Sequence, residues 1–125
     1  MADALVNVRY MVEDVAKSVA WYTDILGFAP LTNAAPHFAD VKRGGLRLLL
    51  SGRTSSAGRP MPDGSEPAPG GWNRIQIIVE NLEAEVERLK GLKARFRNTI
   101  VKGPGGAQIL LEDPSGNLVE LFQPR

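Results

Sequence analysis

The sequence lacks cysteine and has one histidine, His37, in 125 residues. Without cysteine there can be no disulfide, no thiolate nucleophile and no cysteine-based metal site. Any Ser-His-Asp triad would have to use His37, because no second histidine is available. His37 follows Pro36 between two predicted strands and is expected to face solvent.

Neither charge sign is in excess, since 15 Lys and Arg against 14 Asp and Glu leave a net charge of +1. No strong field therefore attracts the chain to nucleic acid or to an anionic membrane. The chain also lacks a long apolar run, and residues 1–4 do not resemble the start of a signal peptide. We expect a soluble, cytoplasmic protein with no nucleic-acid or membrane partner.

One segment has the composition of an irregular loop. In residues 52–71, twelve of twenty residues are Gly, Pro or Ser. Such a segment buries little surface and is typical of a flexible connector, although loops of this length also serve as lids or arms. We therefore expect a single domain of two modules, covering residues 4–51 and 72–125, joined by the linker 52–71.

The two predicted modules resemble each other in sequence. Residues 12–15 (VEDV) match residues 79–82 (VENL), and residues 45–50 (GLRLLL) match residues 117–122 (NLVELF). The first match has an offset of 67 positions and the second an offset of 72. A repeat of this kind indicates one supersecondary unit that is used twice.

Hydrophobic periodicity predicts the same order of elements in both modules. Asp14 and Asn81 are predicted N-caps of helices, and Gly27 is placed to end the first helix. The predicted strands cover residues 5–12, 28–32, 38–42 and 46–51, then 74–79, 95–99, 108–112 and 118–122. Alternating Lys93, Arg95 and Arg97 predict a basic edge strand. Each module is thus expected to be β-α-β-β-β, an α+β architecture.

Alternation along the strands separates two faces. The apolar face expected beneath the helices contains Val8, Tyr10, Val12, Ile75, Ile77, Val79, Val119 and Leu121. The opposite face is a mixture of polar, charged and aromatic side chains: Asn7, Arg9, Met11, Trp72, Arg74, Gln76, Ile78, Leu118, Glu120 and Phe122. This face is either solvated, as in many antiparallel sheets, or one wall of a cleft for a small molecule.

Two segments, residues 12–28 (VEDVAKSVAWYTDILGF) and 111–124 (LEDPSGNLVELFQP), resemble the vicinal oxygen chelate superfamily. This superfamily includes glyoxalase I, extradiol dioxygenases, fosfomycin-resistance enzymes and bleomycin-resistance binding proteins. The resemblance covers nearly the whole chain. It implies that the two βαβββ modules form a curved mixed sheet with a central cleft, and that the chain forms a homodimer.

The resemblance also implies four positions where metal-dependent relatives carry ligands. In this sequence they are Asn7, Leu48, Arg74 and Glu120, of which only Glu120 is a good ligand. Leu48 offers no donor, and the permanent cation of Arg74 would repel a metal ion. We therefore expect no metal and no cofactor, with the Arg74 guanidinium beside Glu120 in place of the ion.

The preferred hypothesis is a metal-free protein that binds or sequesters a planar or drug-like small molecule, as the bleomycin-resistance branch does. The expected ligand-binding residues are Asn7, Arg9, Leu48, Trp72, Arg74, Gln76, Glu120 and Phe122. Two alternatives stay open. One is an enzyme, a lyase, isomerase or dioxygenase, either metal-dependent or with Glu120 as the base, which is the only catalytic candidate. The other is a dimeric interaction module without a ligand.

Overall fold

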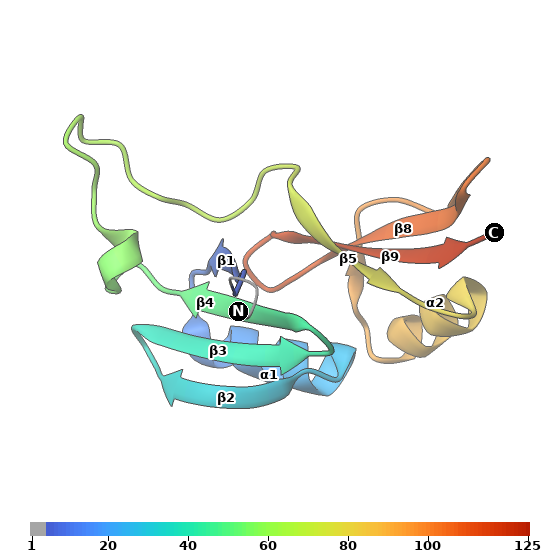
Figure 1. Ribbon diagram of the computed structural model, residues 1–125, viewed down its shortest axis with the longest axis horizontal. Coiled ribbons are helices and arrows are strands. Elements are labelled where there is room, and N and C mark those ends of the chain that lie inside the picture. Colours follow the sequence, from blue (N-terminus) through green and yellow to red (C-terminus); the bar gives the residue numbers. More distant parts are fainter. Residues whose placement is uncertain (1–4) are drawn as a thin grey trace. The chain divides into compact units, whose positions relative to one another are not determined.

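The computed structural model describes residues 5–125 of the chain (Figure 1). Ala4, where the sequence predicts the first module to begin, lies outside the described residues. The chain forms two compact units, one extending to Pro69 and the other covering Gly70–Arg125. Their boundary falls within the segment 52–71, in which the backbone forms one 3-10 helix, Ser56–Gly58, and no strand.

The first unit is a four-stranded sheet with a helix on one face (Figure 1). Its elements are β1 (Val8–Met11), α1 (Val15–Leu26), β2 (Ala29–Ala34), β3 (Phe38–Arg43) and β4 (Leu46–Ser51). The strand order is β1-β4-β3-β2, with β1 parallel to β4 and the other neighbours antiparallel. The predicted order of elements is confirmed, although β1 is shorter than the predicted strand 5–12.

The second unit repeats this arrangement with one more strand. Its elements are β5 (Arg74–Ile78), α2 (Leu82–Gly91), β6 (Arg95–Phe96), β7 (Val101–Gly103), β8 (Gly106–Glu112) and β9 (Leu118–Pro124). The order is β5-β9-β8-β6, and β7 also pairs with β8. β5 runs parallel to β9, as β1 does to β4. Both units are therefore built as helix-covered mixed sheets, which confirms the predicted α+β class.

The predicted strand 95–99 is only two residues long. After Phe96, the backbone N–H of Arg97 still donates to the Leu110 carbonyl at 2.9 Å. The N–H of Leu110, however, donates to the side-chain oxygen of Asn98 at 2.9 Å instead of to a backbone carbonyl. The side chain ends the ladder there, and the chain pairs with β8 again only at Val101.

Both helices begin where their sequences predict, and the first also ends at its predicted residue. The Asp14 side chain accepts a hydrogen bond from the Lys17 N–H, and the Asn81 side chain accepts one from the Ala84 N–H. Each therefore satisfies one of the donors that a helix start leaves free. Gly27 follows α1 with φ of 71°, a left-handed conformation that glycine adopts without steric cost.

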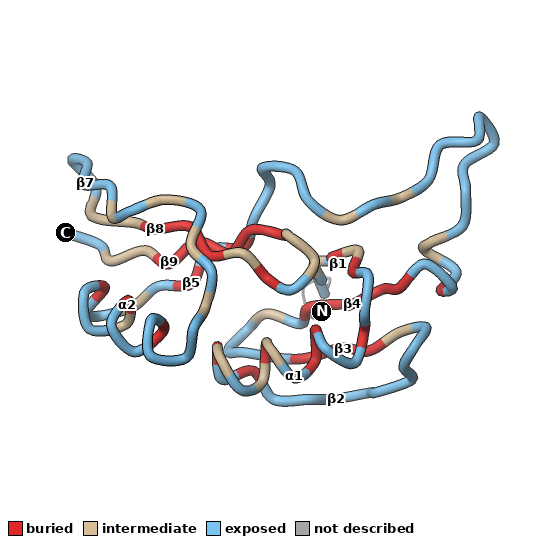
Figure 2. Tube along the Cα trace, turned by 180° about the vertical axis from the view of Figure 1, so that it is seen from behind, coloured by how far each residue is buried: buried red, intermediate tan, exposed pale blue. Residues whose placement is uncertain are grey.

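The hydrophobic core of each unit lies between its helix and its sheet. Tyr10, Val12, Ile75 and Ile77 are buried, as are both apolar residues predicted for β9, whereas Val8 and Val79 are half-buried. Figure 2 shows the buried backbone concentrated in β3, β4, β8 and β9, while β2 is exposed along its whole length. The positions predicted to face the helices are thus buried, except for two that are partly exposed.

The core of the first unit contains an aromatic cluster. Tyr22 of α1 is fully buried, and its ring meets that of Phe28 edge-on with 5.3 Å between centroids. Trp21 packs edge-on against Tyr22 at 4.8 Å and is half-buried. Such edge-to-face contacts add to the stabilisation that burial of the rings provides.

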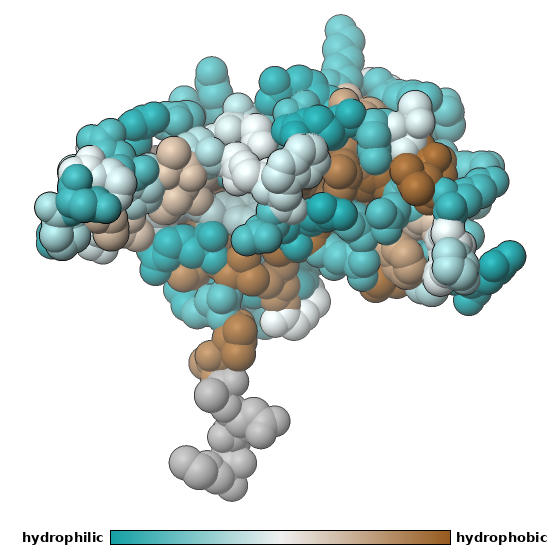
Figure 3. Space-filling view, turned by 90° about the horizontal axis from the view of Figure 1, so that it is seen from above, coloured by the Kyte–Doolittle hydropathy of each residue, from teal (hydrophilic) through white to brown (hydrophobic). Residues whose placement is uncertain are grey.

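Exposed apolar side chains are spread over the surface. In the face seen in Figure 3 they form separate patches bordered by hydrophilic residues. Scattered patches of this kind are normal for globular units. Among residues 5–125, no helix combines the length and the apolar character needed to cross a membrane.

Candidate functional site

The side chains of Arg74, Gln76 and Glu120 meet on the face of the second sheet that lies opposite α2. In the parallel pair of β5 and β9, Gln76 lies opposite Glu120, and Arg74 lies opposite Leu118. The neighbouring positions Ile75, Ile77, Val119 and Leu121 point to the helix. Alternation therefore turns the three polar side chains away from the core, to the face that the helix does not cover.

Glu120 is a buried carboxylate with both oxygens occupied. Its side chain is 7% exposed. One oxygen accepts hydrogen bonds from Nε and Nη2 of Arg74 at 3.0 and 2.9 Å, and the other accepts one from the Gln76 amide at 2.6 Å. A buried charge needs such compensation. The Arg74 guanidinium provides it and holds Glu120 in a single arrangement.

Trp72 and Arg97 extend this cluster. Trp72 is 66% exposed, and its carbonyl accepts a hydrogen bond from Nη1 of Arg74 at 3.2 Å. The Arg97 guanidinium lies 5.5 Å from the centre of the Trp72 ring and forms an ion pair of 2.7 Å with Glu112. A cation over one indole face leaves the other face available for stacking. We call Trp72, Arg74, Gln76, Arg97 and Glu120 the Arg74 cluster.

Phe122 belongs to the same face of the sheet. It follows Glu120 by two residues on β9 and lies opposite Ile78 of β5 and Gln108 of β8. It is half-buried, so part of its ring borders the surface next to the Arg74 cluster. Five of the predicted ligand-binding residues thus lie on one face of the second unit: Trp72, Arg74, Gln76, Glu120 and Phe122.

Arg97 and Glu112 are members of this face that the sequence analysis did not assign to the site. The alternation of Lys93, Arg95 and Arg97 predicts only a basic edge strand for Arg97. Alternation along β8 contains the missing signal, because Leu110 lies opposite Glu120 and Glu112 lies opposite Leu118. Both therefore belong to the face of Glu120, and Arg97 follows from its ion pair with Glu112.

In the first unit, the strand register contradicts the prediction that Leu48 lies on the ligand-binding face. Leu48 lies opposite Val8, is fully buried and faces α1. Leu49, not Leu48, lies opposite Arg9, as Glu120 lies opposite Gln76. The last strands of the two units therefore correspond with an offset of 71 and not 72. Because strand side chains alternate, this single residue moves Leu48 to the other face.

Asn7 and Arg9 are both exposed. Asn7 precedes β1, and Arg9 of β1 donates a hydrogen bond to the Ser51 hydroxyl of β4 at 2.9 Å. Arg9 thus lies on the face of the first sheet that α1 leaves uncovered. His37 is exposed as expected, and its ring nitrogen is 2.6 Å from the Thr54 hydroxyl oxygen.

A second buried carboxylate, Asp40, lies on the uncovered face of the first sheet. It is 2% exposed and lies opposite Leu49 on β4. One oxygen accepts a hydrogen bond from the Thr32 N–H at 2.6 Å, and the other accepts one from Arg47 at 2.7 Å. Burial raises the pKa of Asp40, but the bonds from Thr32 and Arg47 together outweigh it and hold the pKa below its usual value.

The burial of Asp40 is explained by an irregularity in the pairing of β2 with β3. The register between β2 and β3 shifts between Pro30 and Asn33, where the backbone ladder is interrupted. The carboxylate binds the Thr32 N–H within this interruption. Such a bulge leaves a backbone donor without a partner across the strands. Asp40 is not among the predicted site residues, although the apolar residues on either side of it in β3 indicate that it turns to the other face.

The donor atoms around Glu120 do not fit a divalent metal ion. Both carboxylate oxygens already accept hydrogen bonds, and a guanidinium lies where a cation would have to enter. In the part of the chain that the structure describes, no three His, Cys, Asp or Glu side chains are grouped closely enough to hold an ion. Zinc and similar sites need at least three such donors.

The family model of the Glyoxalase/Bleomycin resistance protein/Dioxygenase superfamily matches residues 4–121. A search of curated proteins found no match.

Solved structures with the same fold support this match. A lactoylglutathione lyase from Agrobacterium tumefaciens has a TM-score of 0.75 and 19% identity, with 98% of this chain and 94% of that chain covered. A virulence protein from Salmonella typhimurium has a TM-score of 0.74 and 21% identity, with 100% and 99% covered. TnmS3, an antibiotic binding protein from Streptomyces sp. CB03234, has a TM-score of 0.69 and 22% identity, with 100% and 99% covered. At these identities the likeness shows the fold alone.

Proposed function

Because the chain belongs to the Glyoxalase/Bleomycin resistance protein/Dioxygenase superfamily, we propose that it binds and sequesters a planar or drug-like small molecule without transforming it. The observation that carries this proposal is the state of Glu120, whose two oxygens are both held by Arg74 and Gln76. A fold shared by enzymes and binding proteins does not decide between them, so the argument has to come from the site.

The enzyme hypothesis requires a base or a metal ligand with a free lone pair directed at the substrate. In the Arg74 cluster, Glu120 accepts three hydrogen bonds from Arg74 and Gln76, which take three of the roughly four acceptor positions of a carboxylate. Glu112, another carboxylate on this face, is itself paired with Arg97 at 2.7 Å. This favours binding over catalysis at Glu120.

The surroundings of Glu120 suit a flat ligand with an acceptor group. The indole of Trp72 is exposed, and one ring face is backed by the Arg97 guanidinium. The amide of Gln76 and the half-exposed ring of Phe122 border the same surface. Aromatic rings with a few directed polar groups are the usual composition of a small-molecule site. Asn7 and Arg9 remain sequence-based predictions for the same ligand.

We expect a thermal-shift screen of planar drugs and aromatic metabolites to identify a compound that stabilises the protein and quenches its tryptophan fluorescence. Trp72→Ala should weaken binding of that compound about tenfold, since stacking contributes roughly 1–1.5 kcal/mol. Leu31→Ala removes another exposed apolar side chain, in the first unit, and should leave binding unchanged. If no planar compound binds saturably, or if Trp72→Ala binds as the native protein does, the proposal is wrong.

We also propose that ligand binding by this protein requires no metal ion. Protein purified without chelator is expected to contain well below one equivalent of Zn, Ni, Mn or Fe by elemental analysis. Addition of each ion should change neither the melting temperature nor the binding of a ligand from the screen. One bound ion per chain would instead support the metal-dependent enzyme.

We also propose a homodimer, on the basis of the sequence resemblance. Sedimentation equilibrium should then give twice the chain mass of 13.6 kDa at micromolar concentration. A monomer over the whole concentration range contradicts this part of the proposal. A dimer that binds no compound of the screen would favour the interaction module instead.

A further inference from the structure

The second unit contains a cavity of about 410 Å³ on the helix side of its sheet. Its apolar wall comes from Val86 of α2, Phe96 of β6, Ile109 of β8 and Ile100. Ile109 lies opposite Leu121, whose side chain faces α2, whereas Glu120 faces the other way. The cavity is therefore separated from the Arg74 cluster by the thickness of the sheet, and the two share no residue.

A comparison of the two units explains why space remains here. In the first unit, the ring of Tyr22 fills the layer between helix and sheet and packs against Phe28. The two helices correspond with an offset of 67, but the following strands correspond with an offset of 66, because Pro30 pairs with Val41 as Phe96 pairs with Leu111. Leu89 therefore stands at the position of Tyr22 and Ala94 at that of Phe28; Leu89 is buried but has no ring, and Ala94 has only a methyl group. The second unit thus lacks the two aromatic side chains that close this layer in the first.

The polar groups that line the cavity are donors. Lys90 is largely exposed, and its ammonium group is 3.8 Å from the Glu87 carboxylate. Asn98 uses its side-chain oxygen to accept from the Leu110 N–H, so its amide nitrogen is the group that it offers. Thr99 adds a hydroxyl. Among the residues that the structure describes, no carboxylate lines this cavity, so its charge and hydrogen-bonding capacity are complementary to an anion.

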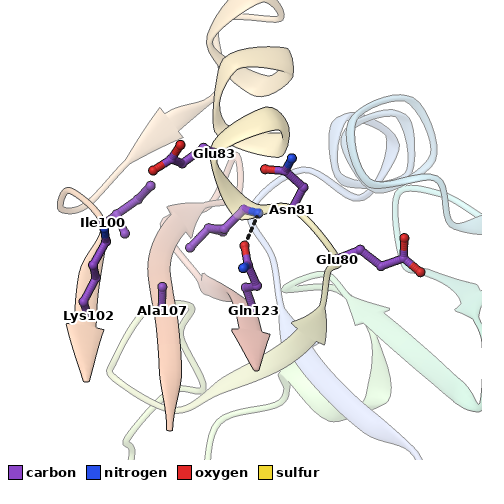
Figure 4. A pocket seen from close by; sticks show the side chains of 8 residues that line it. Glu80, Asn81, Glu83, Ile100, Lys102, Ala107 and Gln123 are labelled. Carbon is purple, nitrogen blue, oxygen red and sulfur yellow. Dashed lines mark hydrogen bonds between the residues drawn. The ribbon is translucent and has the colours of Figure 1, made fainter. Parts of the chain in front are cut away.

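A neighbouring cavity of about 320 Å³ adjoins the first one. It also includes Ile100, and it lies at the start of α2, where the Gln123 side chain accepts from the Leu82 N–H (Figure 4). Figure 4 shows the Glu83 carboxylate on the side of Ile100. Lys102 lines this neighbouring cavity as well as Glu83, so it contains charges of both signs. Lys90 is the charged side chain that lines the cavity of 410 Å³, so a carboxylate is placed there and the apolar part points towards Ile100.

From this arrangement we propose that the cavity binds an apolar monocarboxylate, with its carboxylate at Lys90 and its alkyl chain or ring among Val86, Phe96, Ile100 and Ile109. A chain of about eight carbons suits a pocket of this size, which lies within the range of small-molecule sites. This site goes beyond the proposed function, because it uses other residues and another ligand chemistry.

The test is a titration of ¹⁵N-labelled protein with octanoate, followed by amide chemical shifts. We expect saturable shifts in α2, residues 96–100 and β8. 1-Octanol has the same chain without the charge, and it should bind about fivefold more weakly. Lys90→Gln should weaken octanoate binding by a similar factor, as expected for a partly exposed ion pair. Lys17→Gln, an exposed lysine of α1, should have no effect.

The second part of the test uses a variant that fills the cavity with a larger side chain. Ile100→Trp should abolish octanoate binding while the rest of the amide spectrum stays dispersed. Trp72→Ala should leave octanoate binding unchanged, so that failure of this site and failure of the proposed function are distinguishable. The proposal is overturned if no saturable shifts occur, if 1-octanol and Lys90→Gln match the native result with octanoate, or if Ile100→Trp still binds.

Discussion

Arg74→Met is expected to lower the free energy of unfolding by about 3 kcal/mol, because it leaves a carboxylate buried without its cation. The Glu120 side chain is 7% exposed and that of Arg74 is 29% exposed, so the carboxylate cannot reach water as the guanidinium can. The Gln76 amide would still hold one oxygen, which keeps the loss at the low end of the range for broken buried pairs. Urea unfolding at pH 7 measures the effect.

Two further variants test whether the burial of Glu120 causes the loss of stability that we expect for Arg74→Met. Glu120→Gln should cost only about 1 kcal/mol, because it removes the buried charge and leaves Arg74 partly solvated. Arg53→Met breaks an ion pair with Glu13 in which the side chains are 58% and 46% exposed, and it should change stability far less than Arg74→Met does. If Arg74→Met cost no more than Arg53→Met, Glu120 would not depend on its cation for burial.

Asp40→Ala is expected to lower the free energy of unfolding by about 2–3 kcal/mol. The substitution removes charge-assisted hydrogen bonds from the Thr32 N–H and from Arg47 at a nearly inaccessible position. Arg47 is 44% exposed and can be solvated afterwards, so the loss is smaller than at Arg74. Asp24→Ala, at an exposed carboxylate of α1, should change stability by less than about 0.5 kcal/mol.

The effect of Asp40 should depend on pH in a defined direction. The folded protein holds the pKa of Asp40 below its ordinary value of 3.8. The carboxylate therefore stabilises the fold fully above that value, and this stabilisation is lost as the pH falls through the lower pKa of the folded state. The difference in stability between native protein and Asp40→Asn should be constant from pH 7 to 5 and shrink below about pH 4. A difference that grows on acidification contradicts the assignment.

Elements whose signals are local could be predicted from the sequence. The caps Asp14 and Asn81, the helix end at Gly27 and the two faces of β5 and β9 each follow from a few neighbouring residues. The Arg74 cluster was also accessible, because Arg74, Gln76 and Glu120 all lie on the uncovered face once alternation is applied. Arg97 was not, because its place depends on its partner Glu112 in another strand.

The sequence by itself determined the order of the elements, the repeat of the βαβββ unit and the faces of its strands, because helix caps, turns and alternation act over a few residues. The tertiary structure decided the rest. It placed Leu49 rather than Leu48 opposite Arg9, since the pairing of β1 with β4 joins residues forty positions apart, and a shift of one position reverses every side chain. It also decided which donors occupy Glu120 and where the second unit leaves a cavity, because both depend on packing between elements that are distant in the chain.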